Sequence, residues 1–259
     1  MITGIFDSHA HYDDEAFDKD RAALLTLLRG RGVCGIINAA SNLESARHGI
    51  ALARQFPFIR AAAGIHPLDA DTVTPDSMNE LRQLLQEPEV VALGEIGLDF
   101  HYDVPRELQF PLLRDQLALA REMDMPVILH DRDAHGPMLE LLKEFRPRGV
   151  VHCFSGSAEM AQEVVKLGLY VGLGGAATFK NAVHPLKVAA VVPDDRLLLE
   201  TDAPYMTPVP FRGKRNDSAM ITYTAERIAQ VRGTTAQALC DLTRRNACTL
   251  FGLNEKDFI

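Results

Sequence analysis

Residues 126–154 read PVILHDRDAHGPMLELLKEFRPRGVVHCF, and this stretch decides the fold. Two short apolar runs, Pro126–His130 and Gly149–His152, enclose a segment, Ala134–Glu144, whose apolar residues recur every three or four positions. Nearly continuous hydrophobic runs are typical of strands covered on both faces, and the spacing between them is typical of a helix. A strand, a helix and a second strand in this order predict a parallel pair joined by a crossover helix.

The same alternation extends along the whole chain. Six further apolar runs predict strands, which makes eight in all: Gly4–Ser8, Cys34–Ala39, Ile59–Ala63, Val90–Glu95, Leu169–Leu173 and Arg196–Thr201. Further helical patterns occupy Asp18–Arg29, Glu44–Gln55, Met78–Gln86, Glu107–Glu122, Ser157–Leu167, Leu186–Ala190, Ser218–Arg232 and Thr235–Phe251. Eight such units favour a closed (β/α)8 TIM barrel, formed as a single domain by residues 1–259, over an open doubly wound sheet. The open sheet is the alternative, but no G-x-G-x-x-G turn follows the first strand.

Composition and charge restrict the class of protein. The chain has 259 residues, 47% of them hydrophobic and 24% charged, with a formal net charge of −8. These values exclude a disordered or fibrous chain and argue against a broad basic surface for nucleic acid or membrane. The four cysteines form no C-x-x-C pair, and no apolar run approaches the length of a membrane span. We therefore expect a cytoplasmic protein with reduced thiols and no membrane partner.

Histidines and carboxylates fall at the carboxyl ends of the predicted strands, and these ends converge at one mouth of a (β/α)8 barrel. His9 and His11 form an H-x-H pair, whose side chains project to the same side of an extended segment and can bind one ion together. A carboxylate such as Glu95 can bridge to a second ion about 3.5–4 Å away. The candidate metal ligands are His9, His11, Glu95, His130, His152 and Asp202.

Each candidate also has an ordinary structural explanation. An isolated H-x-H pair is more often at the surface than at a metal, Glu95 could form a salt bridge, and Asp202 could cap a helix. Buried strands that repeatedly end in ionisable residues nevertheless lose stability unless ions or partners neutralise those residues. The set therefore favours a metal centre. Four imidazoles with two carboxylates suit Zn, Mn, Fe, Co or Ni better than an all-oxygen cage for Mg or Ca.

Several sequence motifs carry a family resemblance. The motifs F-D-S-H-A-H, G-I-H-P, G-E-I-G-L-D-F, H-C-F-S-G and E-T-D-A-P-Y, with P-V-P-F-R-G-K-R-N after them, resemble the TatD family of metal-dependent hydrolases and DNases over about residues 5–217. The resemblance implies an amidohydrolase-like barrel with two divalent cations. It places His9, His11 and Asp202 on the first cation, His130 and His152 on the second, and Glu95 on both. Family members cleave phosphodiester bonds in DNA, some as exonucleases.

The implied chemistry is hydrolysis at a metal pair. Two cations lower the pKa of a shared water toward neutrality and polarise the scissile P–O bond, so no serine or cysteine nucleophile is needed. Asp202 and Glu95 are the candidate catalytic residues, Asp202 either as the general base or as a ligand only. We expect two divalent cations per chain, with Zn, Mn, Co, Ni, Fe and, in vitro, Mg as candidates. The motifs at 64–68 and 97–102 depart from the common family pattern, which alters the substrate rim.

Residues beyond the strand ends are candidates for substrate binding. Cations near the mouth could meet the phosphate charge, although solvated loop charges are the alternative explanation. Aromatic rings after strand ends could stack on bases, or be buried in the loop layer: Phe100, Tyr102, Phe154, Phe179 and Tyr205. The predicted substrate-binding residues are His66, Arg132, Lys180, Arg212, Lys214 and Arg215.

Two other functions fit part of the pattern. One is an amidohydrolase acting on a small amide, lactone or ester, and the other is a metal-stabilised binding protein without turnover. A basic cluster at 212–215 favours phosphodiester chemistry, because a neutral amide would leave these charges without a partner. Few basic residues are present to neutralise many phosphates, so the expected partner is the 3′ or 5′ end of a DNA strand or a nucleotide-sized substrate.

Overall fold

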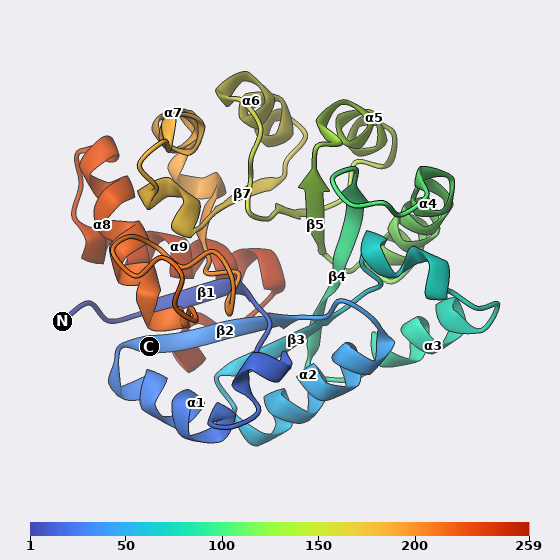
Figure 1. Ribbon diagram of the computed structural model, residues 1–259, viewed down its shortest axis with the longest axis horizontal. Coiled ribbons are helices and arrows are strands. Elements are labelled where there is room, and N and C mark those ends of the chain that lie inside the picture. The colour runs from blue at the N-terminus through green and yellow to red at the C-terminus, as the bar shows by residue number, and fades with distance from the viewer. Residues whose placement is uncertain (259) are drawn as a thin grey trace.

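The predicted strands form one parallel eight-stranded sheet in the computed structural model, which describes residues 1–258 (Figure 1). Neighbours in the sheet are neighbours in sequence, from β1 to β8, and a parallel bridge between Ala10 and Ala203 brings the two ends together. This order confirms the predicted (β/α)8 barrel. The strands are β1 Ile5–Ala10, β2 Val33–Ala39, β3 Ile59–Ala63, β4 Val90–Asp99, β5 Val127–Arg132, β6 Gly149–Val151, β7 Tyr170–Leu173 and β8 Leu197–Leu199.

Helices cover the outside of the barrel, as the ring of coils in Figure 1 shows. Several of them begin where a polar side chain accepts a hydrogen bond from the first turn, as Ser157 does from the backbone N–H of Met160. The helices are α1 Arg21–Gly30, α2 Leu43–Gln55, α3 Ser77–Leu84, α4 Arg106–Glu122, α5 His135–Phe145, α6 Ala158–Lys166, α7 Val183–Val191, α8 Ile221–Arg232 and α9 Ala236–Phe251. Within residues 1–258, no helix has the length and apolar character needed to cross a membrane.

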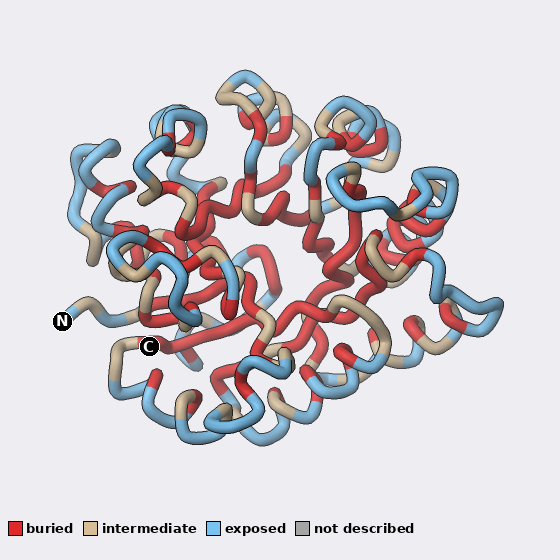
Figure 2. Tube along the Cα trace, in the orientation of Figure 1, coloured by how far each residue is buried: buried red, intermediate tan, exposed pale blue. Residues whose placement is uncertain are grey.

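The barrel interior is a cluster to which every strand contributes a side chain. Phe6 of β1, Ala92 of β4, Ile128 of β5 and Leu198 of β8 are members, and the end of α9 joins them together with Phe258. A second, larger cluster packs the outward-facing strand residues against the helices, and Figure 2 accordingly shows buried strands inside a more exposed ring. Because α9 fills one end of the barrel, the opposite end, where the strands terminate, is left for a site.

Candidate metal centre

The six predicted metal ligands come together at the carboxyl-terminal mouth of the barrel. Several predicted strand ends were wrong, however. Strand β1 continues two residues past Ser8, so His9 lies within it, and β8 ends two residues before Thr201. Strand β4 continues four residues past Glu95, and β5 continues two residues past His130. The cause is that β4 and β5 stay paired as far as Asp99 and Arg132. Glu95 therefore projects from the middle of a strand.

Two irregularities in strand pairing turn ligands toward the interior. Side chains alternate along a strand, so the inward-facing Phe6 of β1 would direct His9 outward, and the inward-facing Ala92 of β4 would direct Glu95 outward. The register of β1 against β2 shifts between Asp7 and Ala10, and the register of β4 against β5 shifts between Leu93 and Ile96. Such irregularities re-aim side chains, and here they bring His9 and Glu95 to the same place.

Glu95 lies between two sets of imidazoles, with one carboxylate oxygen facing each set. Its Oε2 atom is 3.2 Å from Nε2 of His9 and 3.6 Å from Nε2 of His11. Its Oε1 atom is 2.8 Å from Nδ1 of His130 and 2.7 Å from Nε2 of His152. The side chain is almost completely buried. A carboxylate that offers one oxygen to each of two donor groups has the geometry of a bridging ligand.

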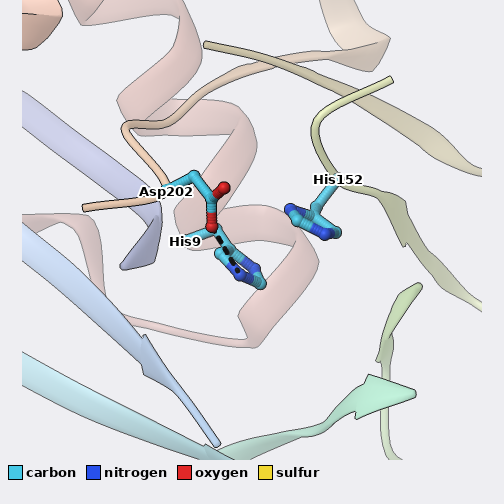
Figure 3. Close-up of side chains that lie close together, drawn as sticks. All are labelled: His9, His152 and Asp202. Carbon is cyan, nitrogen blue, oxygen red and sulfur yellow. Dashed lines mark ion pairs between the residues drawn. The ribbon is translucent and has the colours of Figure 1, made fainter. Parts of the chain in front are cut away.

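Asp202 completes the first of these two sets. Its Oδ1 atom lies 3.2 Å from Nε2 of His11 and 3.7 Å from Nε2 of His9. Figure 3 shows Asp202, His9 and His152 gathered at one point from three different parts of the chain, with the Asp202–His9 ion pair dashed. The rings of His9 and His152 are stacked, with centroids 3.9 Å apart, so the two sets adjoin.

The donor set fits divalent transition metals. The Nε2 atoms of His9 and His11 are 3.1 Å apart and face the same carboxylates, so lone pairs crowd a small buried volume. Burial holds the pKa of His9 below its usual value, so this ring is neutral and has a lone pair to donate. Burial raises the pKa of Glu95, but the charge of the neighbouring His152 imidazole outweighs this and brings its pKa well below the usual range. Burial lowers the pKa of His11, His130 and His152, but the neighbouring carboxylates outweigh this and raise it above the usual value. A divalent cation would displace the protons of these rings and bind the freed imidazoles together with the ionised carboxylates.

Comparisons with known proteins agree with this geometry. Residues 6–252 match the family model described as TatD related DNase. The chain belongs to the TatD related DNase family of metal-dependent hydrolases. It is 39% identical to the uncharacterized metal-dependent hydrolase YabD of Bacillus subtilis over 96% of this chain and 100% of that protein. It is 35% identical to the 3′-5′ ssDNA/RNA exonuclease TatD of Escherichia fergusonii, again over 96% and 100%. The crystal structure of the TatD homologue YJJV from Escherichia coli K12 superposes with a TM-score of 0.92, at 37% identity over 98% and 100% of the two chains.

Two buried acids that support the ligands of this TatD-family chain escaped the sequence analysis. Asp99 Oδ2 lies 2.9 Å from Nε2 of His130, on the side of the ring away from Glu95. Glu200 Oε1 lies 3.7 Å from Nδ1 of His152 and accepts a hydrogen bond from the backbone N–H of Cys153. A carboxylate hydrogen-bonded behind a metal-binding histidine fixes the orientation and tautomer of the ring, as Asp99 does for His130. Glu200 lies near the His152 ring but beyond hydrogen-bond distance of it. Their signal was present in the G-L-D and E-T-D motifs, but only Asp202 of these acids was selected.

Two of the predicted substrate-binding residues line the same cavity as the candidate ligands. The cavity has a volume of about 550 Å³, and His66 and Arg132 lie in its wall. Nε2 of His66 is 3.5 Å from Oε1 of Glu95. Among residues 1–258, Arg132 is the one lysine or arginine that lines this cavity. A phosphate in the cavity would therefore meet a single fixed cation of the protein.

The remaining predicted cations lie elsewhere in the structure. Arg212, Lys214 and Arg215 line an adjoining hollow, which shares Tyr205 with the metal cavity. Arg215 forms a bidentate salt bridge with Asp20, at 2.7 Å for each contact, and Arg212 stacks on Phe179. Lys180 is exposed and follows a short 3-10 helix, Gly175–Thr178. The basic cluster is thus beside the metal cavity, and its role in substrate binding stays a prediction.

Proposed function

We propose that this protein is a two-metal phosphodiesterase that removes nucleotides from an end of single-stranded DNA or RNA. In the proposal, His9, His11 and Asp202 hold one divalent transition-metal ion, and His130 and His152 hold the other. Glu95 is shared between the ions. The observation that carries the proposal is the division of the donors into two sets, each facing a different oxygen of Glu95.

The chain's own residues supply positioning and proton transfer. When bound, the ions would lower the pKa of water and neutralise negative charge on the phosphate. Burial raises the pKa of Asp202, but its hydrogen bond with His11 outweighs this and brings the pKa below the usual value. The Asp202 carboxylate is therefore ionised at neutral pH, and it accepts the proton of the attacking water and returns it to the leaving oxygen. Arg132 holds a non-bridging phosphate oxygen from the cavity wall.

The size of the cavity and the net charge of the chain support a strand end as the substrate. A volume of about 550 Å³ lies within the usual range for a small-molecule site and suits one or two nucleotides. The net charge of −8 disfavours contact with many phosphates of a long duplex. The relative from Escherichia fergusonii is named as a 3′-5′ exonuclease of single-stranded DNA and RNA, which supports a 3′ end and single strands.

A turnover panel tests the proposal. The protein is loaded separately with Mn, Co, Ni, Zn or Mg. It is then offered fluorescein-labelled single-stranded DNA and RNA, the matching duplex, a simple phosphodiester, and a set of amides and lactones. We expect stepwise shortening of single strands with at least one transition metal, and loss of that activity in the isosteric Glu95→Gln variant. Hydrolysis confined to amides or lactones, or full activity in Glu95→Gln, contradicts the proposal.

A further inference from the structure

Two tyrosines stand at the mouth of the metal cavity with much of their surface in solvent. Tyr102, which follows β4, is 51% exposed, and Tyr205, which follows β8, is 55% exposed. Both line the cavity that contains Glu95. Strands β4 and β8 are separated by three strands in either direction around the barrel. The two tyrosines therefore belong to opposite sides of the mouth.

The other aromatic residues that follow strand ends have structural roles. Phe154 is 4% exposed, and Phe100 packs against the core with Arg106 above its ring, 3.9 Å from the ring centroid. Phe179 lies under Arg212 at the same distance. Burial and stacking within the protein explain these three rings. Arg132 also approaches the Tyr102 ring, but both tyrosines keep more than half of their surface in solvent at the site.

Tyr102 is held close to a candidate metal ligand. Its backbone N–H donates to Oδ1 of Asp99 at 3.2 Å, while Oδ2 of the same carboxylate contacts His130. The guanidinium of Arg132 lies 5.1 Å from the centroid of the Tyr102 ring, within the range of a cation–π interaction. One carboxylate thus holds both the backbone of Tyr102 and the ligand His130, and Arg132 supports the Tyr102 ring beside the cavity.

Tyr205 is fixed on the other side of the mouth. Its hydroxyl donates to Oδ2 of Asp14 at 2.7 Å, and its backbone N–H donates to the carbonyl oxygen of Asp202 at 2.8 Å. Its ring lies 6.4 Å from the ring of His11, centroid to centroid. A ring that is already ordered loses little entropy when a ligand stacks on it.

We propose that Tyr102 and Tyr205 each stack on an unpaired nucleobase, one on either side of the scissile phosphate. The proposal rests on the proposed function, because the metal centre between the rings would act on the phosphate that joins the two nucleotides. A paired duplex end keeps its bases stacked on each other and cannot place them on two separate rings. The two rings therefore select unpaired strands and require bases on both nucleotides.

The energy of stacking sets the expected effect. A base stacked on an aromatic side chain contributes about 1–3 kcal/mol, which is about 5-fold to 150-fold in kcat/KM. Leucine keeps a bulky apolar side chain but removes the flat ring, whereas phenylalanine keeps the ring and removes only the hydroxyl. Tyr102→Leu and Tyr205→Leu should show this loss on a normal strand. The matched Tyr102→Phe variant should stay within about threefold of the wild type, because stacking does not need the hydroxyl. Tyr205→Phe also loses the hydrogen bond to Asp14 that orders the ring, so its loss should lie between those of Tyr102→Phe and Tyr205→Leu.

Abasic substrates distinguish stacking from a general disturbance of the site. The manganese-loaded full-length variants are assayed on a single-stranded oligonucleotide. They are also assayed on the same strand with a tetrahydrofuran abasic residue in place of one of the two nucleotides that flank the scissile phosphate. We expect the loss of kcat/KM caused by each leucine substitution to be at least about fivefold smaller on the strand that lacks the base that stacks on that tyrosine. Equal losses on the normal and abasic strands would overturn the proposal.

A binding measurement separates this proposal from the proposed function. Fluorescence of 2-aminopurine, placed at a terminal position of the strand, is followed on binding to wild type and leucine variants in EDTA. We expect quenching by the wild type and loss of quenching in the leucine variant of the matching tyrosine. Quenching without any phosphodiester hydrolysis would overturn the proposed function and leave the stacking sites standing. Hydrolysis that proceeds equally well on abasic strands would overturn the stacking sites alone.

Discussion

The Asp99→Asn substitution changes one atom behind a candidate metal ligand and tests how firmly the protein controls the His130 ring. Oδ2 of Asp99 lies 2.9 Å from Nε2 of His130, and Oδ1 accepts hydrogen bonds from the backbone N–H groups of His101, at 2.8 Å, and Tyr102, at 3.2 Å. An ionised carboxylate only accepts hydrogen bonds, so the ring proton is held on Nε2. The lone pair of Nδ1, next to Glu95, is then free for a metal.

Asparagine cannot satisfy both sets of partners. If its oxygen stays with the two backbone N–H groups, its amide N–H faces Nε2 of His130 and drives the ring proton to Nδ1, where the metal would bind. If the amide rotates, its N–H group faces the backbone N–H groups of His101 and Tyr102, and donors are then opposite donors. Loss of such a supporting carboxylate costs about 10–100-fold in metal affinity. This corresponds to about 1.4–2.7 kcal/mol.

Calorimetric titration of the metal-free protein with Zn²⁺ measures the effect. Asp133→Asn is the matched control, because Asp133 pairs with His101 at 3.2 Å on the surface. Burial raises the pKa of Asp99, but the bond to His130 and the two backbone donors outweigh it and lower the pKa to about 2. The affinity difference should therefore persist across pH 5–8. Wild-type affinity in Asp99→Asn, or an equal loss in Asp133→Asn, refutes the reasoning.

Three further predictions concern neighbouring features. Arg132→Met should raise KM for single strands about tenfold or more, because the arginine contacts phosphate. The affinity for metal, measured by calorimetry, should be unchanged. An unchanged KM would count against this role of Arg132. Gly97→Ala should lower the free energy of unfolding by at least about 1–3 kcal/mol in urea, because a Cβ there would collide with the carbonyl oxygen of His130. Gly136→Ala, which meets nothing within 4 Å, is the control and should show no loss. The hydrogen bond that His135 donates to the Asp131 carboxylate raises the pKa of His135, so His135→Gln should destabilise the protein more at pH 5.5 than at pH 9. The opposite order would be inconsistent with that ion pair.

The fold followed from the sequence because its signals are local. Each strand is a short apolar run and each crossover is a helical pattern, so the strand–helix–strand unit at 126–154 could be recognised before any contact was known. Strand ends were harder to predict. Gly97, Leu98 and Asp99 look like a loop after Glu95, but their pairing with β5 makes them part of β4. Such pairing depends on residues more than 30 positions away.

The candidate ligands were predicted as a set, but their orientation was not. Ideal alternation would have turned His9 and Glu95 away from the interior, and the register shifts that correct this come from pairing between strands. Whether a basic side chain is free to bind substrate also depends on distant partners. Arg215 is engaged by Asp20, which lies 195 positions away in the sequence, so no local pattern could indicate that it is already paired.

Metal content tests the central claim most directly. The wild-type protein and Glu95→Gln are stripped of metal, reconstituted with Zn²⁺ or Mn²⁺, freed of excess ion and analysed by plasma mass spectrometry, with circular dichroism to verify folding. A carboxylate shared between two ions predicts two metals per folded wild-type chain and at most one in Glu95→Gln. A single metal in the wild type, or two metals retained in the variant, would contradict the bridged pair on which the account depends.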